Sequence, residues 1–167
     1  MRSDVPPTAK PLRVLCLEDN PLIVMHLEQM IEDCGHVFTA SLGSFADLRA
    51  QFDALAIDCV LVDMDLADGR TGPDAAAWLA DRKTPALFVT GQERLAEELR
   101  DLVVGVVPKP LSLRVLKAGL DQIALRLSLD DALRPAAARR PDLGAVGSCT
   151  AARQVPIAVN LGAQKGI

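Results

Sequence analysis

The sequence predicts an α/β protein built on one doubly wound parallel sheet. Short apolar runs alternate with helix-type patterns five times along the first three quarters of the chain. The run at 59–62 contains no polar side chain, as expected of a strand covered on both faces. Because strand–helix–strand connections are right-handed, this alternation leaves few arrangements other than a parallel sheet between two helical layers.

The first strand and helix are defined by their boundary residues. The apolar run 12–17 is the first strand. Asn20 is a suitable N-cap and Pro21 suits the first helical position, so a helix should begin there and run to about Cys34. Gly35 is expected to end it, since glycine readily takes the left-handed conformation at that place.

The later elements follow the same reasoning. Ser44 and Ser112 are expected caps, and an unusually short helical pattern precedes the last strand. The remaining strands are predicted at 36–42, 59–63, 86–89 and 103–107, and the remaining helices at 45–55, 73–81, 92–102 and 113–127.

Charged and polar residues follow four of these strands. They are Glu18 with Asp19, Asp63, Thr90 and Lys109. In the flavodoxin-like (βα)5 order 2-1-3-4-5, the first and third strands are neighbours at the edge where open α/β sheets bind ligands. We therefore expect these side chains to share one site.

Carboxylates placed so closely repel one another unless a cation joins them. The expected cation is Mg²⁺ or Mn²⁺, held directly by Asp19 and Asp63, through water by Glu18, and by the backbone carbonyl of Asp65. Lys109 and Thr90 would bind phosphate oxygens, and Asp63 could then attack a phosphoryl group.

Composition limits the other functions. Half of the 167 residues are apolar, the net charge is −4, and no basic cluster indicates a nucleic-acid surface. No apolar run approaches the length needed to span a bilayer, and the N-terminus lacks the apolar centre of a signal peptide. The expectation is a cytoplasmic protein with no membrane or nucleic-acid partner.

Three segments are expected along the chain. Residues 1–11 read as a flexible leader, 12–127 as the domain, and 128–167 as a low-complexity tail that docks or is partly disordered. The first 127 residues carry 13 basic and 19 acidic side chains, and the last 40 carry 5 and 3. The tail can prolong the last helix to Leu133, and its segment 155–159 is the one part suited to docking.

From about Pro11 to Leu127 the chain resembles the receiver domain of two-component response regulators. The motifs are Leu-Glu18-Asp19-Asn, Leu-Val-Asp63-Met-Asp-Leu, Val-Thr90-Gly and Lys109-Pro. The resemblance implies that Asp63 is the phosphoacceptor, Thr90 the switch hydroxyl and Lys109 the phosphate-sensing lysine. It also implies a cis bond before Pro110, a histidine kinase or histidine phosphotransfer protein as donor, and a downstream protein target.

The sequence departs from this family at the relay position. Three residues before the lysine the family usually carries Tyr or Phe, whereas this chain has Val106. The signal must then pass through another movement, such as that of the helix expected at 92–102 or of the tail. Asp65 and Gln92 occupy positions from which they would tune autodephosphorylation.

The segment 85–91 is similar to the Pro-Phe-x-Phe-Ala-Thr-Gly-Tyr strand of the alphaproteobacterial FAT GUY subgroup, with Gln92 in place of the Tyr. This similarity favours a stand-alone response regulator that acts in phosphorelay or stress signalling through protein contacts. Separately, we expect a phosphoacceptor rather than a turnover enzyme, with a homodimer as one possible state. The length of the tail argues against an attached DNA-binding domain.

Two alternatives remain open. One is a receiver-shaped binding module that acts without phosphorylation. The other is a phosphatase of the haloacid dehalogenase type, in which Asp63, Asp65, Thr90, Lys109 and the pair Asp130-Asp131 would form the site. The phosphatase reading leaves Glu18 and Asp19 unused. It also expects the nucleophile on the first strand of the core, whereas Asp63 follows the third strand.

Overall fold

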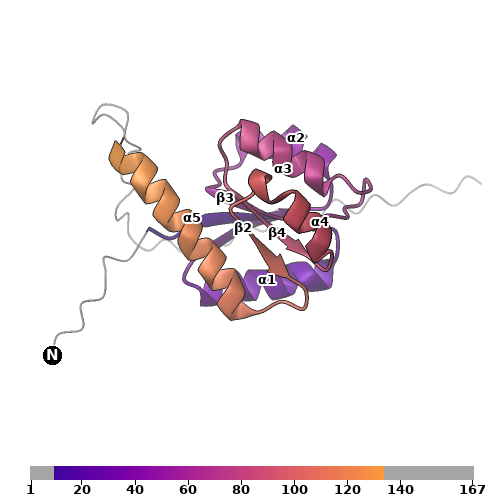
Figure 1. The fold of residues 1–167 in the computed structure, drawn as a ribbon, viewed down its shortest axis with the longest axis horizontal. Helices are drawn as coiled ribbons and strands as arrows, with labels where there is room; N and C mark the ends of the chain where they lie inside the picture. The colour runs from indigo at the N-terminus through magenta and orange to yellow at the C-terminus, as the bar shows by residue number, and fades with distance from the viewer. Residues whose placement is uncertain (1–9, 134–167) are drawn as a thin grey trace, which may run out of the picture.

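A computed structural model describes residues 10–133 of the chain. Its centre is a five-stranded parallel sheet in the order β2-β1-β3-β4-β5, with helices on both faces (Figure 1). The predicted flavodoxin-like fold is confirmed. The expected leader lies almost entirely outside the described residues, as do residues 134–167 of the expected tail, which include the segment 155–159.

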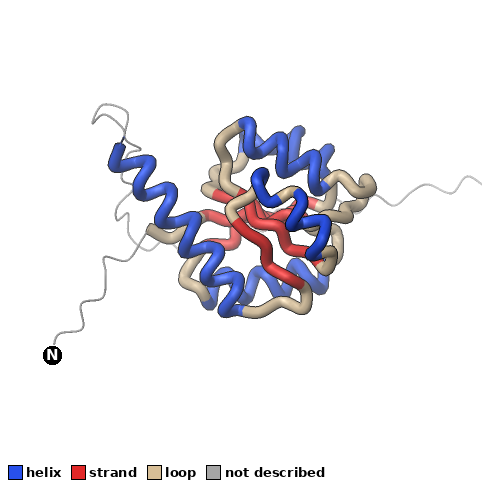
Figure 2. The backbone as a smooth tube through the Cα atoms, in the orientation of Figure 1, coloured by secondary structure: helices blue, strands red, loops and turns tan. Residues whose placement is uncertain are grey.

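The elements alternate strictly along the chain, apart from two short 3-10 turns (Figure 2). In order they are β1 (Arg13–Leu17), α1 (Pro21–Asp33), β2 (Val37–Leu42), α2 (Phe45–Gln51), η1 (Phe52–Ala54), β3 (Cys59–Val62), α3 (Gly72–Asp81), β4 (Ala86–Thr90), α4 (Glu93–Glu98), η2 (Arg100–Leu102), β5 (Gly105–Pro108) and α5 (Leu113–Leu133).

The predicted boundary residues of α1 act as expected. The Asn20 side chain accepts a hydrogen bond from the backbone N–H of Leu22, and Pro21 begins the helix. At the other end Gly35 has a φ of +81°. Glycine adopts this left-handed conformation without steric strain, whereas residues with a Cβ atom are strained in it. The turn at Gly35 sends the chain back into β2, beside β1.

Two apolar clusters hold the helices on the sheet. Alternate residues of a strand point to opposite faces, so Cys16 and Leu61 pack with α1 and α5, while Leu17 and Val62 pack with α2, α3 and α4. All residues of β3 and β4 are buried. The polar groups of these central strands therefore appear only where the strands end.

Helix α5 packs very closely on the sheet at Gly119. A Cβ atom built there would lie 2.8 Å from the Leu87 side chain, which is closer than ordinary packing permits. Beyond this contact the helix continues to Leu133, and its last turns project past the sheet (Figure 1). The expected domain boundary at 127 thus falls inside a continuous helix.

The region between β4 and β5 differs in detail from the prediction. Instead of one helix over 92–102, the chain forms the short α4 and then η2. Strand β5 begins at Gly105 and not at Val103, because Val103 closes the 3-10 turn through its N–H to the Arg100 carbonyl.

Within residues 10–133, no helix is both long and apolar enough to cross a membrane.

We expect His36 to make stability depend on pH. Its Nδ1 accepts the Leu12 N–H at 3.2 Å, so the ring is neutral in the fold. Burial, assisted by Lys117 and opposed by Asp121, lowers the pKa of His36. The unfolded chain therefore binds the proton more readily, and this contribution to stability, present above the unfolded pKa of about 6.5, is lost as the pH falls through the folded pKa.

The measurement is urea unfolding at pH 7.5 and pH 5. Wild type should lose more free energy of unfolding over this interval than His36→Gln, whose side chain does not titrate. Equal losses in the two proteins would show that His36 has no part in the pH dependence.

Candidate functional site

The carboxyl edge of the sheet joins two carboxylates through one ammonium group. Lys109 Nζ, after β5, donates hydrogen bonds to Glu18 Oε2 at 2.9 Å and to Asp63 Oδ2 at 2.6 Å. Glu18 follows β1 and Asp63 follows β3, which are adjacent strands. Lys109 is 91 positions from Glu18 in the chain and 46 from Asp63. The three side chains thus meet in one ion cluster, as the strand order predicts.

Burial and ion pairing oppose each other in this cluster. Burial raises the pKa of Glu18, and the hydrogen bonds from Lys109 and the Asn20 backbone offset only part of this effect. Burial also acts to lower the pKa of Lys109, but its hydrogen bonds to Asp63 and Glu18 outweigh it, so this pKa is raised. The lysine therefore stays charged and supplies a fixed positive charge beside Asp63.

The backbone around Asp63 is fixed from two sides. Its N–H donates to the Leu17 carbonyl at 2.9 Å, which ties it to the end of β1. Its Oδ1 accepts the Met64 N–H at 2.7 Å. On the other side Gly72, the first residue of α3, lies so close that a Cβ atom there would overlap the Asp63 carbonyl oxygen. Sequence reasoning missed Gly72, although a glycine at the start of a helix beside the site was a usable signal.

Thr90 and Lys109 are connected through the backbone. The Lys109 N–H donates to the Thr90 carbonyl at 2.9 Å, and the bond from Lys109 to Pro110 is cis. The Thr90 side chain is buried, and its Oγ1 accepts the backbone N–H of Gln92 at 2.9 Å. The hydroxyl hydrogen of Thr90 is then available for another acceptor.

Asp65 links the loops that follow β3 and β4. Arg70 Nε donates to its Oδ1 at 3.2 Å, and the Gln92 side-chain amide donates to its Oδ2. We call these three side chains the Asp65 bridge. The sequence placed Asp65 and Gln92 near each other but did not identify Arg70, since nothing in its local pattern distinguishes it from a solvated arginine.

Asp19 lies at the exposed rim of the site. The nearby oxygen-donor side chains Asp19, Glu18 and Asp63 are of the kind that Mg²⁺ prefers, so the chemistry of this set fits the metal. In the part of the chain that the structure describes, however, no three His, Cys, Asp or Glu side chains converge closely enough to hold a metal. The geometry shows instead the lysine between Glu18 and Asp63.

Val106 stands in β5 opposite Phe88 of β4. Its side chain is half-buried and packs against the cluster under α2, α3 and α4. A valine has no ring that could turn between a buried and an exposed position.

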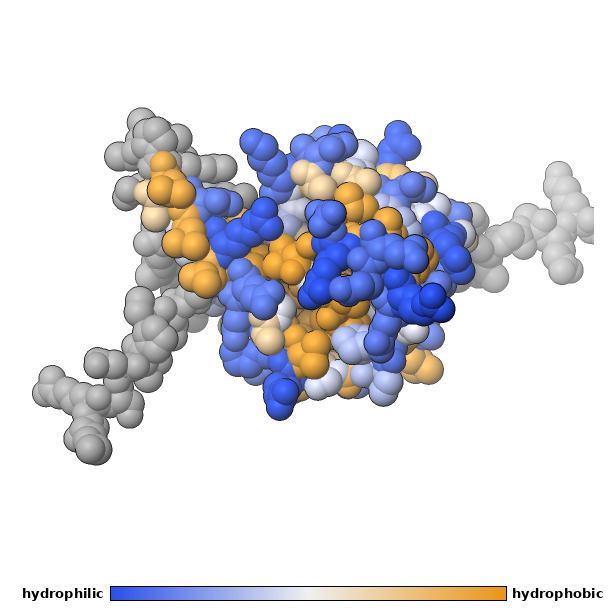
Figure 3. Space-filling model, viewed as in Figure 1, coloured by the Kyte–Doolittle hydropathy of each residue, from blue (hydrophilic) through white to orange (hydrophobic). Residues whose placement is uncertain are grey.

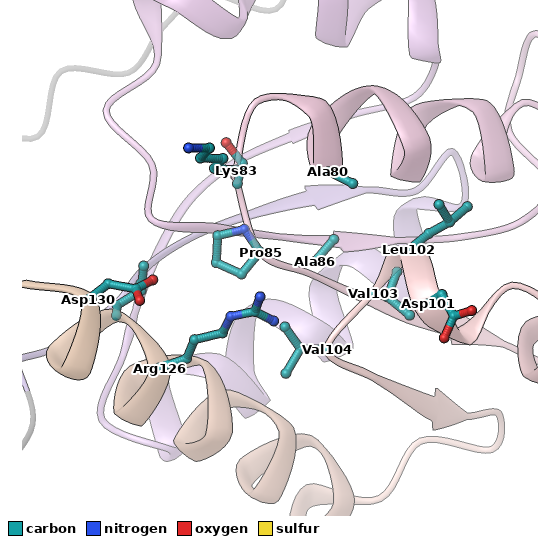
Figure 4. Close-up of a pocket in the computed structure, with 12 residues that line it drawn as sticks. Ala80, Lys83, Pro85, Ala86, Asp101, Leu102, Val103, Val104, Arg126 and Asp130 are labelled. Atoms are coloured by element: carbon teal, nitrogen blue, oxygen red, sulfur yellow. The ribbon is translucent and has the colours of Figure 1, made fainter.

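A separate hollow of about 340 Å³ lies at the opposite edge of the sheet. Pro85 precedes β4 and Val104 precedes β5, and Arg126 reaches toward both from α5 (Figure 4). Its walls carry charges of both signs, with Lys83 and Arg126 against Asp101 and Asp130. The hollow is distant from Glu18 and Asp63, because it lies at the amino ends of the strands and they lie at the carboxyl ends.

A family model described as the response regulator receiver domain matches residues 14–121. The chain belongs to this family. Receiver domains are phosphoacceptor regulators and not turnover enzymes, and they generally bind Mg²⁺. The resemblance inferred from the strand-end motifs is thereby confirmed.

Curated relatives include the sensor protein GacS of Pseudomonas syringae pv. syringae, 29% identical over 133 residues, and the phyllosphere-induced regulator PhyR of Methylorubrum extorquens, 30% identical over 112 residues. The matches cover 75% and 65% of this chain. They cover only 15% and 42% of those proteins, so this chain corresponds to one part of each.

Solved structures of similar shape include the PhyR receiver domain of Erythrobacter litoralis, at 28% identity and a TM-score of 0.62, which covers 69% of this chain and 91% of that one. PhyR of Brucella abortus is 31% identical, with a TM-score of 0.65, over 73% of this chain and 51% of that one. The narrower FAT GUY subgroup stays a prediction.

Replacement of Gly72 by alanine should disturb Asp63 directly. The added methyl group would overlap the Asp63 carbonyl and the Met64 backbone, and such overpacking costs about 1–3 kcal/mol. Gly91→Ala is the matched control, since no atom lies within 4 Å of a Cβ at that position. Urea unfolding and the amide NMR signals of Asp63 and Met64 test this, and equal stability of the two variants would refute it.

Proposed function

We propose that this receiver domain accepts a phosphoryl group on Asp63 from a phosphohistidine of a histidine kinase or histidine phosphotransfer protein. The supporting observation is the hydrogen bond from Lys109 Nζ to Asp63 Oδ2 at 2.6 Å. Glu18 is the second acceptor of the same ammonium group. This arrangement places one positive charge where the phosphate charge would arrive.

In the proposed transfer, an Asp63 carboxylate oxygen forms a bond to phosphorus as the phosphorus–nitrogen bond of the donor breaks. The imidazole leaves with the bonding electrons and takes up a proton. Lys109 would remain beside the new phosphoryl group and neutralise part of its charge, and Thr90 would donate its hydroxyl hydrogen to a phosphoryl oxygen. Such a reaction depends on positioning and charge more than on covalent assistance from the protein.

Asp19, Glu18, Asp63 and the Asp65 carbonyl are the groups proposed to hold Mg²⁺. When bound, the metal supplies positive charge that offsets the negative charge of the phosphoryl group. Glu18 already engages Lys109 and the Asn20 N–H through its two oxygens, whereas Asp19 is exposed and accessible to a cation.

We propose that the signal leaves the site through Thr90 and Gln92 and not through an aromatic side chain. The Gln92 N–H is bound to the Thr90 hydroxyl oxygen, and α4 begins at the next residue. A movement of Thr90 toward the phosphate would break this bond and release the start of α4. Since α4 is short and Val106 offers no ring, this path is the one that these contacts support.

The outcome of this movement would be a changed affinity for a downstream protein. One solved relative is described as the anti-anti-sigma factor PhyR of Bartonella quintana, which supports a protein target by similarity. Cytoplasmic location is part of the proposal, because Cys16, Cys34 and Cys59 are free thiols, as expected in a reducing compartment. That the domain acts as a stand-alone regulator stays a prediction.

The alternatives differ in how they fit these observations. A phosphatase of the haloacid dehalogenase type finds no support, since Asp130 and Asp131 lie on α5 and the family match is to receivers. A binding module that works without phosphorylation shares the fold, so only a labelling experiment separates it from the proposal.

Asp63→Asn should abolish labelling by acetyl phosphate in the presence of Mg²⁺. The amide cannot attack phosphorus but keeps the size and shape of the carboxylate. Wild type should take up close to one phosphoryl group per chain, measured by intact mass, and Asp74→Asn is the surface control. Equal labelling of wild type and Asp63→Asn, or none with acetyl phosphate or a phosphohistidine donor, would remove the proposal.

Gln92→Ala should shorten the lifetime of the phosphoryl group. The substitution frees one oxygen of Asp65, which can then orient a water molecule toward the phosphoryl group. Loss of a hydrogen bond worth about 1 kcal/mol corresponds to roughly fivefold in rate. Phosphate release after removal of the donor measures this, and adding Asp65→Asn to Gln92→Ala tests whether the Asp65 carboxylate is the group responsible. A lifetime equal to or longer than that of wild type contradicts the assignment.

A further inference from the structure

The free end of α5 carries a second apolar surface that the domain does not use. Leu125, Leu129 and Leu133 are 61%, 56% and 84% exposed, and we call them the α5 stripe. Because they are four residues apart, they lie on one side of the helix. Figure 3 shows apolar residues gathered along the projecting end of α5.

The α5 stripe is distinct from the face that holds α5 on the sheet. That inner face consists of Leu116, Leu120, Ile123 and Ala124, all buried. The contacts among residues 10–133 leave the stripe exposed to water. Contiguous apolar surface on a projecting element indicates an interaction site.

We propose that residues 155–159 of the same chain dock on the α5 stripe. This segment contains Val155, Ile157 and Val159. If the segment docks in an extended conformation, these alternating side chains would lie on one side of it. It offers a short apolar edge to match a short apolar strip. The sequence around it is otherwise rich in glycine, alanine and polar residues.

The connection between the two partners has a suitable length. Residues 134–154 join the end of the stripe to the segment. A connection of this length would span about 25 Å if it behaved as a random coil. The stripe itself is about 12 Å long, at 1.5 Å per helical residue. The tether therefore reaches the stripe and holds the segment at a high effective concentration.

Charge favours the same pairing. Residues 10–133 carry twelve basic and twenty acidic side chains, for a net charge of −8, whereas residues 134–167 carry five basic and one acidic, for +4. Asp130 and Asp131 lie between the leucines of the stripe. The basic residues of the connection, such as Arg139 and Arg140, would pass near these carboxylates.

A second copy of the chain suits the stripe less well. A stable dimer buries about 800 Å² on each partner, and three leucine side chains on one helix present only part of such an area. A tethered segment needs less contact, because its association is intramolecular.

The test replaces Val155, Ile157 and Val159 together by serine in the full chain. Hydrogen–deuterium exchange of peptides that cover 125–133 should become roughly tenfold faster, equivalent to a loss of about 1.4 kcal/mol of local stability. Leu143→Ser with Val146→Ser, in the same tail but outside the segment, is the matched control and should leave the exchange unchanged. Adding the triple substitution to Leu129→Ser should produce no further increase.

Three results would overturn the proposal. One is equal exchange at 125–133 in wild type and the triple variant. Another is an equal effect of the control pair. The third is protection that rises with protein concentration together with a dimeric mass in light scattering, which would assign the stripe to a second copy. None of these readouts depends on phosphorylation.

Discussion

The site is organised by one lysine whose ammonium group forms ion pairs with two carboxylates. Without Lys109, Glu18 and Asp63 would place two negative charges at neighbouring strand ends, one of them buried. Repulsion of this kind raises the pKa of carboxylates or separates them. With the ammonium between them, the ends of β1, β3 and β5 are held together in the arrangement from which the proposed chemistry starts.

Fold and site differ in how far the sequence predicts them. Strand order and the meeting of Glu18, Asp63 and Lys109 follow from apolar runs and from the polar residues at their ends, because a parallel sheet brings its carboxyl ends to one edge. The Arg70 contact of the Asp65 bridge did not follow, since the position of Arg70 depends on how the loop after β3 folds. Gly72 is a different case: its position at the start of a helix was a usable signal, but only the folded structure shows that its backbone approaches that of Asp63 and Met64 too closely for a side chain.

The boundaries of β5 and α4 show a further limit. Val103 and Val104 are as apolar as the strand that follows them, so periodicity assigns them to it. In the structure the Val103 N–H closes a 3-10 turn, and the Val104 N–H donates to the Ala86 carbonyl just before the pairing of β5 with β4 begins. Local hydrogen bonding, which hydrophobicity does not record, decided the boundary.

The burial of β3 and β4 on both faces has a consequence for how this domain can change over evolutionary time. Residues enclosed in this way must be apolar and of suitable volume, but many combinations meet that condition. The fold can therefore persist while the sequence changes, and the PhyR receiver domain of Erythrobacter litoralis shares it at 28% identity with a TM-score of 0.62. The strand ends are under a stricter condition, because a charge there must find its counterpart on another strand. Divergence in such a protein is expected to be slower at these strand ends than at the apolar positions of the strands themselves.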